Sequence, residues 1–240
     1  WSLRGGGVLE AKQCVESISE KTLGEFGNIG VGGMSNADPI FRGSFERFRR
    51  EDFPPVFVRG LFVGENLRDW AGTTPDAVYF PYDESIDLKT PPERVRQNLW
   101  PYREFMWSRA VFGGGTYKEA NRPWFEWHQV TADKYRHPLT IAFAEVATHN
   151  HFVLDRGGKV FKQTAPVIKL PKQADEEDHL ELLGPLNSST GCFWMKQIFQ
   201  NKGYGADSAG ARSTKRPWEN FYQRSGTGMK DFPLPAERPL

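Results

Sequence analysis

Two histidines separated by one residue are the clearest candidate metal ligands in this sequence. The run is His149-Asn150-His151, and Asp155 follows four residues later. Alternate residues of a strand point to the same face, so both imidazoles would lie together if this segment is extended. Such a pair with a carboxylate could hold a divalent ion and cleave a phosphodiester bond. Because no other ligand follows at an obvious spacing, we expect polar residues facing a groove and no metal. A metal-dependent nuclease is the alternative.

The sequence lacks the loop with which DNA amino-methyltransferases hold their target base. That loop needs Asn, Asp or Ser, then two prolines and an aromatic residue, because a polar side chain and a prolyl carbonyl accept the amine. The pairs Pro54-Pro55 and Pro91-Pro92 have unsuitable neighbours. The glycine run at 27–33 is not followed by a helix pattern, so a structural turn fits it better than a cofactor loop. We therefore expect no catalytic residue and no cofactor in this chain.

The best candidate for reading DNA is the aromatic segment 121–129. Arg122 can pair with guanine edges or phosphates and Gln129 with adenine, while Trp124 could stack on a base or brace the loop. Tryptophans three residues apart also fit a buried aromatic cluster with Arg122 and His128 at its rim. Both interpretations stay open at the level of the sequence.

Charge is balanced over the whole chain, with 31 Lys and Arg against 30 Asp and Glu. A nucleic-acid surface must therefore be local, with acidic residues elsewhere, such as the block 175–178. The loop 201–216 is rich in glycine and basic residues and could order on a DNA backbone, with a plain disordered loop as the alternative. We expect DNA contacts from basic, amide and aromatic side chains. They are Arg103, Arg109, Lys118, Arg122, Trp124, His128, Gln129, Lys134, Arg136, His149, Asn150, His151, Lys159, Lys162, Arg212, Lys215 and Arg216.

The composition fits a globular protein in a reducing compartment. Hydrophobic residues make up 38% of the 240 residues, and the two cysteines, Cys14 and Cys192, have no metal-site spacing. No run approaches the roughly 18 apolar residues of a membrane span, and no signal peptide is visible. These features predict a cytoplasmic location. The first residue is Trp1 rather than Met, so we expect a fragment of a longer protein.

Strand patterns fill the middle of the chain and helix patterns its end. We expect strands at 55–63, 77–82, 140–146, 152–154, 159–163 and 167–170, with a hairpin turn at Arg156-Gly157-Gly158. We expect helices near the end of 3–20, over 92–110 with a break at Pro101, from Ser188 or Ser189 to Gln200, and over 218–224. Residues 24–38 look like turns, and Arg68-Asp69-Trp70 looks like an ion pair beside a buried Trp. The order predicts an α+β fold, a mainly antiparallel twisted sheet with flanking helices.

Five pieces of the sequence, in this order, resemble one known family. They are Met34–Asp38, Gly64–Trp70 with Ala77–Asp83, Asn121–Gln129, Thr140–Leu170 and the Leu-Asn-Ser-Ser string at 186–189. They are similar to the C-terminal part of PglX-type adenine-specific DNA methyltransferases of BREX phage-defence systems, most like the type 2 branch. Type IIG restriction–modification enzymes are more distant relatives.

The resemblance implies a DNA target-recognition domain that lacks catalysis of its own. Residues 1–20 would be a linker from a missing N-terminal catalytic domain, 21–185 the recognition domain, and 186–240 a helical segment packed on it. The parent enzyme would use S-adenosylmethionine to methylate adenine and so mark host DNA. The expected partners are double-stranded DNA, the N-terminal methyltransferase domain and other defence proteins. The acidic block leaves a protein–protein scaffold as a further alternative.

Overall fold

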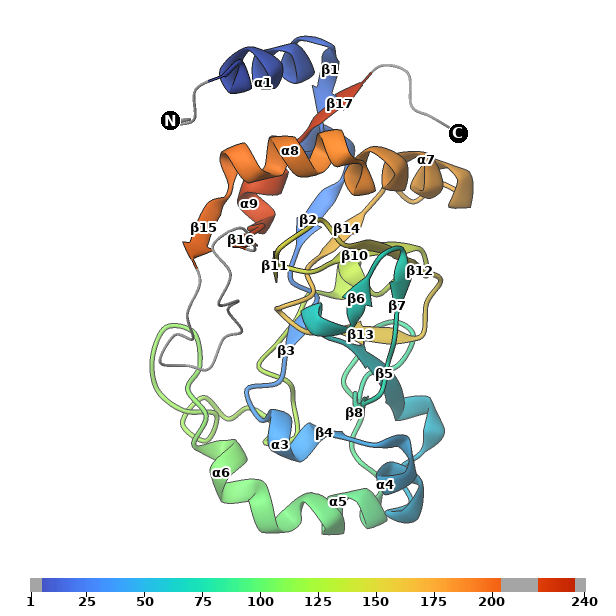
Figure 1. Ribbon diagram of the computed structural model, residues 1–240. Coiled ribbons are helices and arrows are strands. Elements are labelled where there is room, and N and C mark those ends of the chain that lie inside the picture. Colours follow the sequence, from blue (N-terminus) through green and yellow to red (C-terminus); the bar gives the residue numbers. More distant parts are fainter. Residues whose placement is uncertain (1–5, 204–219, 236–240) are drawn as a thin grey trace.

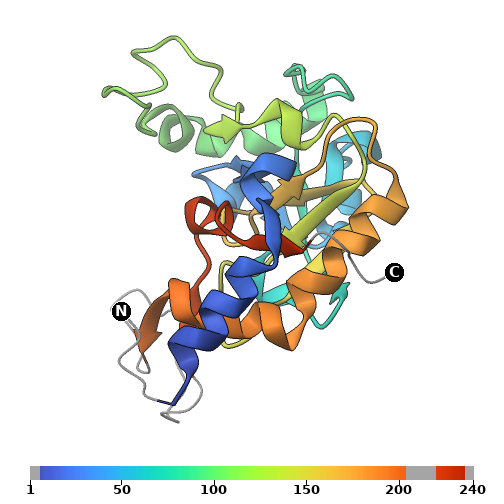
Figure 2. The ribbon, with the colours of Figure 1, turned by 90° about the horizontal axis from the view of Figure 1, so that it is seen from above.

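The computed structural model describes residues 6–203 and 220–235. Helices gather at the two ends of an elongated molecule, and short strands lie between them (Figure 1). One end holds α1 (Val8–Ser17), α7 (Glu176–Asn187) and α8 (Ser189–Ile198), and the other holds α4 (Phe45–Arg50), α5 (Glu93–Leu99) and α6 (Arg103–Trp107). Seen from above, α1 lies across α8 (Figure 2), where the indole of Trp194 donates to Glu16 at 3.0 Å.

The central sheet is antiparallel, with the strand order β12-β10-β14-β2. Its strands are β2 (Asn28–Gly30), β10 (Thr140–Phe143), β12 (Phe152–Asp155) and β14 (Val167–Lys169). Successive side chains of a strand point to opposite faces. In β10, Ile141 and Phe143 accordingly join the core beneath α7 and α8, whereas Ala142 joins a smaller core shared with the second sheet. Both faces of β10 are therefore buried.

The second sheet has the order β13-β5-β8-β4 and contains a parallel pair, β13 with β5. Its strands are β4 (Arg42–Gly43), β5 (Val58–Phe62), β8 (Ala77–Tyr79) and β13 (Lys159–Phe161). The prediction of a hairpin over 152–163 is therefore wrong, because β12 pairs in the central sheet and β13 in this one. Gly157 and Gly158, with φ of 110° and 79°, form the turn that carries the chain between the sheets.

Shorter pairs complete the strand structure. They are β1 (Ser19–Thr22) with β17 (Pro233–Pro235), β3 (Gly33–Met34) with β9 (Gln129–Val130), β6 (Leu67–Arg68) with β7 (Ala71–Gly72), and the three-stranded set β11 (Val146–Ala147), β16 (Phe221–Gln223) and β15 (Gln200–Gly203). The remaining short helices are α2 (Leu23–Phe26), α3 (Asp38–Phe41), α9 (Gly226–Met229) and the 3-10 turns η1 (Pro55–Phe57), η2 (Gly64–Asn66), η3 (Trp100–Tyr102) and η4 (Ala132–Lys134). The β1–β17 pair brings the two ends of the described chain together.

The Leu-Asn-Ser-Ser string fixes the corner between α7 and α8. The amide of Asn187 makes two hydrogen bonds with the main chain of Phe152, accepting from its N–H at 2.9 Å and donating to its carbonyl at 2.8 Å. Ser188 caps α8 by accepting from the N–H of Gly191 at 2.9 Å. A side chain at Gly191 would meet the carbonyl of Pro185 at 2.4 Å, so only glycine allows this close helix contact. The string therefore joins both helices to β12.

The mainly antiparallel α+β architecture is confirmed, with three local corrections. Phe221–Gln223 forms strand β16 where a helix over 218–224 was expected; residues 218 and 219 lie outside the described part. The glycine-punctuated stretch 24–38 contains two strands, β2 and β3, besides turns. Trp70 is 55% exposed rather than buried, and the guanidinium of Arg68 donates to main-chain carbonyls instead of Asp69. The domain boundaries at 20 and 185 stay predictions.

Candidate nucleic-acid interface

A basic groove borders the loop between β9 and β10. It consists of two adjoining depressions of about 590 and 550 Å³ that share Arg136 and His137. Its basic lining residues are Arg59, Lys134, Arg136, His137, Lys159, Lys169, Lys172 and Lys230. Its acidic lining residues are Glu25, Glu84, Asp133 and Asp155. Seven Lys and Arg side chains against four carboxylates leave the basic groove positive even with His137 neutral.

Two buried lysines tie together the segments that line the basic groove. The ammonium of Lys134 donates to the main-chain oxygen of Asn28 at 2.6 Å and to its Oδ1 at 2.9 Å. That of Lys169 donates to the carbonyl of Leu139 at 2.7 Å and to Thr140 Oγ1 at 2.5 Å. Burial lowers the pKa of both lysines to about 8. Lys134 was expected to contact DNA. Its ammonium is instead hydrogen-bonded to Asn28, and the residue is only 2% exposed.

Arg136 is the predicted contact that stands most accessible in the basic groove. Its guanidinium pairs with Asp133 at 2.8 Å, and both side chains are more than half exposed. Such exposed pairs contribute little free energy, so a phosphate can replace the carboxylate. Lys159 also lines the basic groove, but its ammonium bonds the carboxylate of Asp155, which is 1% exposed. The structure thus brings three predicted residues, Lys134, Arg136 and Lys159, to one surface.

Five basic residues of the groove were not among the predicted contacts. They are Arg59, His137, Lys169, Lys172 and Lys230. Their segments lie far apart in the chain and meet only through the sheets and the β9–β10 loop. Lys169 did carry a signal, because a lysine at the end of the apolar run Val167-Ile168 needs buried oxygen partners.

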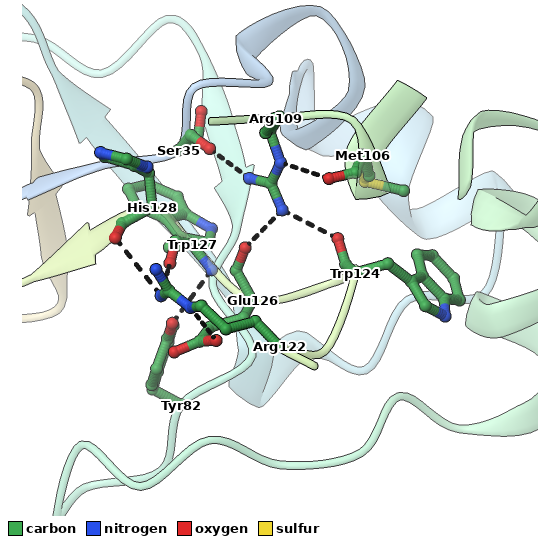
Figure 3. Close-up of polar contacts among 9 residues, drawn as sticks. All are labelled: Ser35, Tyr82, Met106, Arg109, Arg122, Trp124, Glu126, Trp127 and His128. Carbon is green, nitrogen blue, oxygen red and sulfur yellow. Dashed lines mark hydrogen bonds and ion pairs between the residues drawn. The ribbon is translucent and has the colours of Figure 1, made fainter. Parts of the chain in front are cut away.

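Arg109 is the hub of a second cluster, drawn in Figure 3. Its guanidinium is buried and donates to main-chain carbonyls of four residues: Met106 at 3.0 Å, Trp124 at 2.9 Å, Glu126 at 2.8 Å, and Ser35. All its donor nitrogens are therefore engaged with the protein. The expectation that Arg109 touches DNA is wrong for this conformation, because the side chain is held inside the fold by these carbonyls.

Arg122 lies beside Arg109, and both guanidiniums stack on the ring of Tyr117, at 4.4 and 4.1 Å from its centroid. Arg122 also pairs with Glu126 at 2.9 Å, and this ion pair raises the pKa of Arg122. Its Nη2 donates to the carbonyl of Trp127 at 3.2 Å (Figure 3). These contacts connect both sides of the loop 121–128. The side chain of Arg122 is 27% exposed, so part of it faces solvent.

The aromatic segment 121–129 is mainly a core element. Trp124 and Trp127 are 7% and 4% exposed, and the indole of Trp127 donates to the carbonyl of Tyr79 at 3.1 Å. His128 is buried as well, and burial lowers its pKa. Gln129 is half-buried in β9. Trp124 and His128 therefore belong to a buried aromatic cluster and not to an exposed surface for stacking on DNA.

The residues of the His149-Asn150-His151 run are separated by burial. His149 is exposed, whereas His151 is buried and its pKa is lowered by that burial. The side-chain amide of Asn150 donates to the carbonyls of Leu186 and Ser188 at 2.7 and 3.0 Å. Asp155 lies four residues beyond His151, about 13 Å along an extended chain. Among residues 6–203 and 220–235, no group of three His, Cys, Asp or Glu side chains could hold a metal ion.

The remaining predicted contacts lie away from the basic groove or outside the described chain. Arg103 stacks on Trp100 at 4.1 Å, Lys118 is exposed, and Lys162 pairs with Asp38 at 2.6 Å. Arg212, Lys215 and Arg216 fall outside the described residues. In the acidic block, Asp175 caps the N-terminus of α7, where negative charge is stabilised. No described helix combines the length and apolar character needed to cross a bilayer.

Comparison with known proteins places this architecture in a methyltransferase context. No family model matches the chain. The chain is 42% identical over 243 aligned residues to the adenine-specific methyltransferase PglX of Streptomyces coelicolor, and the match covers 100% of the chain and 20% of that protein. The fold is similar to part of the type IIL restriction–modification enzyme MmeI, solved in complex with DNA, with a TM-score of 0.50 and 13% identity over 73% of this chain and 22% of MmeI. The chain thus spans about one fifth of each relative, and over its whole length it is homologous to a segment of PglX-type adenine-specific methyltransferases.

Proposed function

We propose that this chain recognises the DNA target of an S-adenosylmethionine-dependent adenine methyltransferase that marks host DNA in a BREX phage-defence system. The observation that carries the proposal is the basic groove, where seven Lys and Arg side chains from distant segments line one surface. The identity to PglX supports the methyltransferase context, and the fold shared with MmeI supports a role in binding DNA.

The DNA backbone would lie along the basic groove, with phosphates near its exposed cations. Arg136, Lys172 and Lys230 are exposed there, and Arg59 is half-buried. Contacts of this kind set the position of the protein on the duplex, whereas side chains that reach base edges supply specificity. Nε2 of His137 is buried in the protein without a hydrogen-bond partner among the described residues, and it lines both depressions. A small shift of this ring would present a donor or acceptor to DNA.

The partners of the chain follow from the same proposal. Methyl transfer would take place on an N-terminal domain of the parent protein, which binds S-adenosylmethionine, and residues 1–20 would connect the two. Duplex DNA would lie between them in the cytoplasm. Other defence proteins would bind the parent enzyme.

The first experiment is duplex binding by the chain across a salt series. The observed binding constant should fall with salt, with a logarithmic slope of about −0.9 for each phosphate neutralised. Replacing Arg136 or Lys172 by Gln should weaken binding and make the slope shallower by about one unit each. Arg49, an exposed arginine on α4 that does not line the basic groove, provides the charge-matched control as Arg49→Gln.

The outcomes separate the proposal from its alternatives. Salt-dependent binding that ignores EDTA, leaves the DNA intact and responds to Arg136→Gln but not to Arg49→Gln supports recognition. Metal-dependent cleavage would favour a nuclease. Equal effects of Arg136→Gln and Arg49→Gln would mean that the basic groove is not the interface.

A further inference from the structure

A tight hairpin carries an exposed tryptophan in an unfavourable backbone conformation. The strands β6 and β7 are joined by Asp69 and Trp70 alone, whose φ angles are 44° and 74°. Both residues have the left-handed backbone conformation, which is usually found at Asn, Asp or Gly in two-residue hairpin turns. A bulky side chain such as Trp adopts this conformation at a cost in free energy. The indole of Trp70 is 55% exposed, so burial does not offset this cost. Strain of this kind is concentrated at functional sites.

The tip of this hairpin is fixed rather than loose. Leu67 is fully buried, and the N–H of Asp69 donates to Nδ1 of His151 at 3.3 Å. His151 is itself buried beside β12, and desolvation lowers its pKa, so the neutral ring can accept this hydrogen bond. The orientation of the Trp70 backbone is thus set by the central sheet.

Trp70 borders a pocket of about 540 Å³ between the hairpin tip and α8. This volume lies in the range of roughly 300–1,000 Å³ found for small-molecule sites. Polar and aromatic side chains line it, among them His149, Ser189, Phe193 and Lys196. Lys196 makes no ion pair with a carboxylate of the described residues; its ammonium lies 5.8 Å from the ring of Tyr222.

A single lysine gives the pocket its positive charge. Lys196 is the only Lys or Arg among the lining residues. The carboxylate of Asp69, which also lines the pocket, lies 3.4 Å from Nδ1 of His151. An exposed indole with an ammonium beside it provides a flat surface for an aromatic ring and an attraction for its negative substituent.

We propose that this pocket binds a nucleotide, with the base stacked on Trp70 and the phosphate attracted by Lys196. The site goes beyond the proposed groove contact, because none of its lining residues belongs to the basic groove. The nucleotide can come from two sources, an unpaired base in a DNA strand or a free nucleoside monophosphate. Both offer the same ring and phosphate.

The test uses 2-aminopurine, whose fluorescence is quenched when it stacks. The chain is titrated into the free 2-aminopurine deoxynucleoside monophosphate and into a single-stranded oligonucleotide with one 2-aminopurine. Saturable quenching of at least one probe is expected. Trp70→Gly should weaken that binding by about tenfold, since stacking on an aromatic side chain contributes a factor of this order. Lys196→Gln should weaken probe binding severalfold and make it less dependent on salt. Lys196→Arg keeps the positive charge and should bind the probe nearly as well as the native chain.

Controls keep a folding defect and the groove apart from this result. Glycine is the residue best suited to the φ of Trp70, so Trp70→Gly should unfold at the same urea concentration as the native chain or at a higher one. Trp100→Ala removes a similarly exposed indole, 48% exposed on η3, and should leave quenching unchanged. Arg136→Gln should also leave it unchanged, whether or not duplex binding fails. If only the oligonucleotide is quenched, the site binds a nucleotide within a DNA strand. If both probes are quenched, the site binds free nucleotides as well. Quenching that survives Trp70→Gly, or no quenching by the native chain, overturns the proposal.

Discussion

Replacing Arg109 should cost more folding free energy than replacing any exposed arginine of the same region. Its guanidinium serves carbonyls from three separate segments, represented by Ser35, Met106 and Trp124 (Figure 3). In Arg109→Met the side-chain volume is nearly kept, but those buried carbonyls lose their donor. A hydrogen bond from a charged group contributes about 1.5–3 kcal/mol, and such terms are not additive. We expect a loss of about 3–5 kcal/mol in the free energy of unfolding.

The assay is urea unfolding followed by circular dichroism and tryptophan fluorescence. Arg103→Met is the matched control six residues earlier, at the start of α6, because Arg103 stacks on Trp100 and pairs with Glu104 at 3.3 Å. Its loss should stay near 1 kcal/mol or below. Arg109→Lys keeps the charge but not the planar fork, so it should fall between the two. If Arg109→Met loses less than about 1.5 kcal/mol, the network does not organise the loop and this reasoning fails.

Two further predictions concern the corner of α7 and α8 and the buried lysines. Asn187→Ala should lower the free energy of unfolding by about 1–3 kcal/mol, because both main-chain groups of Phe152 lose their partner. The control is Thr190→Ala at an exposed position of α8. If the two variants lose the same free energy in urea unfolding, the prediction is contradicted. Burial lowers the pKa of Lys169 to about 8, so between pH 8 and about 10 the unfolded chain binds more protons and the free energy of unfolding should rise by about 1–3 kcal/mol. Above pH 10 the buried Tyr79 and Tyr135, whose pKa values burial raises, should reverse the trend. Lys169→Met should flatten the rise in unfolding curves measured at several pH values, and an unchanged rise would refute the assignment.

Local patterns in the sequence were enough to predict several elements. Pro101 predicted the interruption between α5 and α6, and the adjacent serines Ser188 and Ser189 predicted the start of α8, where Ser188 is the N-cap. The apolar runs 140–146 and 167–170 predicted β10 and β14, although the first strand already ends at Phe143. These signals depend on neighbours within a few residues, through the missing N–H of proline, a capping hydroxyl or alternating burial.

Pairing between distant segments could not be predicted in the same way. The turn at Gly157-Gly158 has the sequence of a hairpin, but β13 pairs with β5, about a hundred residues earlier in the chain. The aromatic segment around Trp124 fits a DNA surface as well as a core until its neighbours are known. Arg109 and Lys134 were assigned to DNA because a cation is usually exposed. Their burial depends on carbonyl groups from other segments of the chain. The order of residue types along the sequence does not show which segments supply those groups.

The position of β12 relates the two proposed surfaces. Asp155 at its end lines the basic groove, and His151 just before its start holds the hairpin with Trp70. The four residue steps from His151 to Asp155 span about 13 Å, a distance that a DNA strand covers in about four nucleotides at 3.4 Å each. A strand held in the basic groove can therefore extend to the Trp70 pocket within a few nucleotides, and stacking on Trp70 then requires a base that has left the duplex stack. Among DNA ligands, the pocket should for this reason respond to single-stranded or distorted strands, whereas the basic groove should respond to duplex DNA.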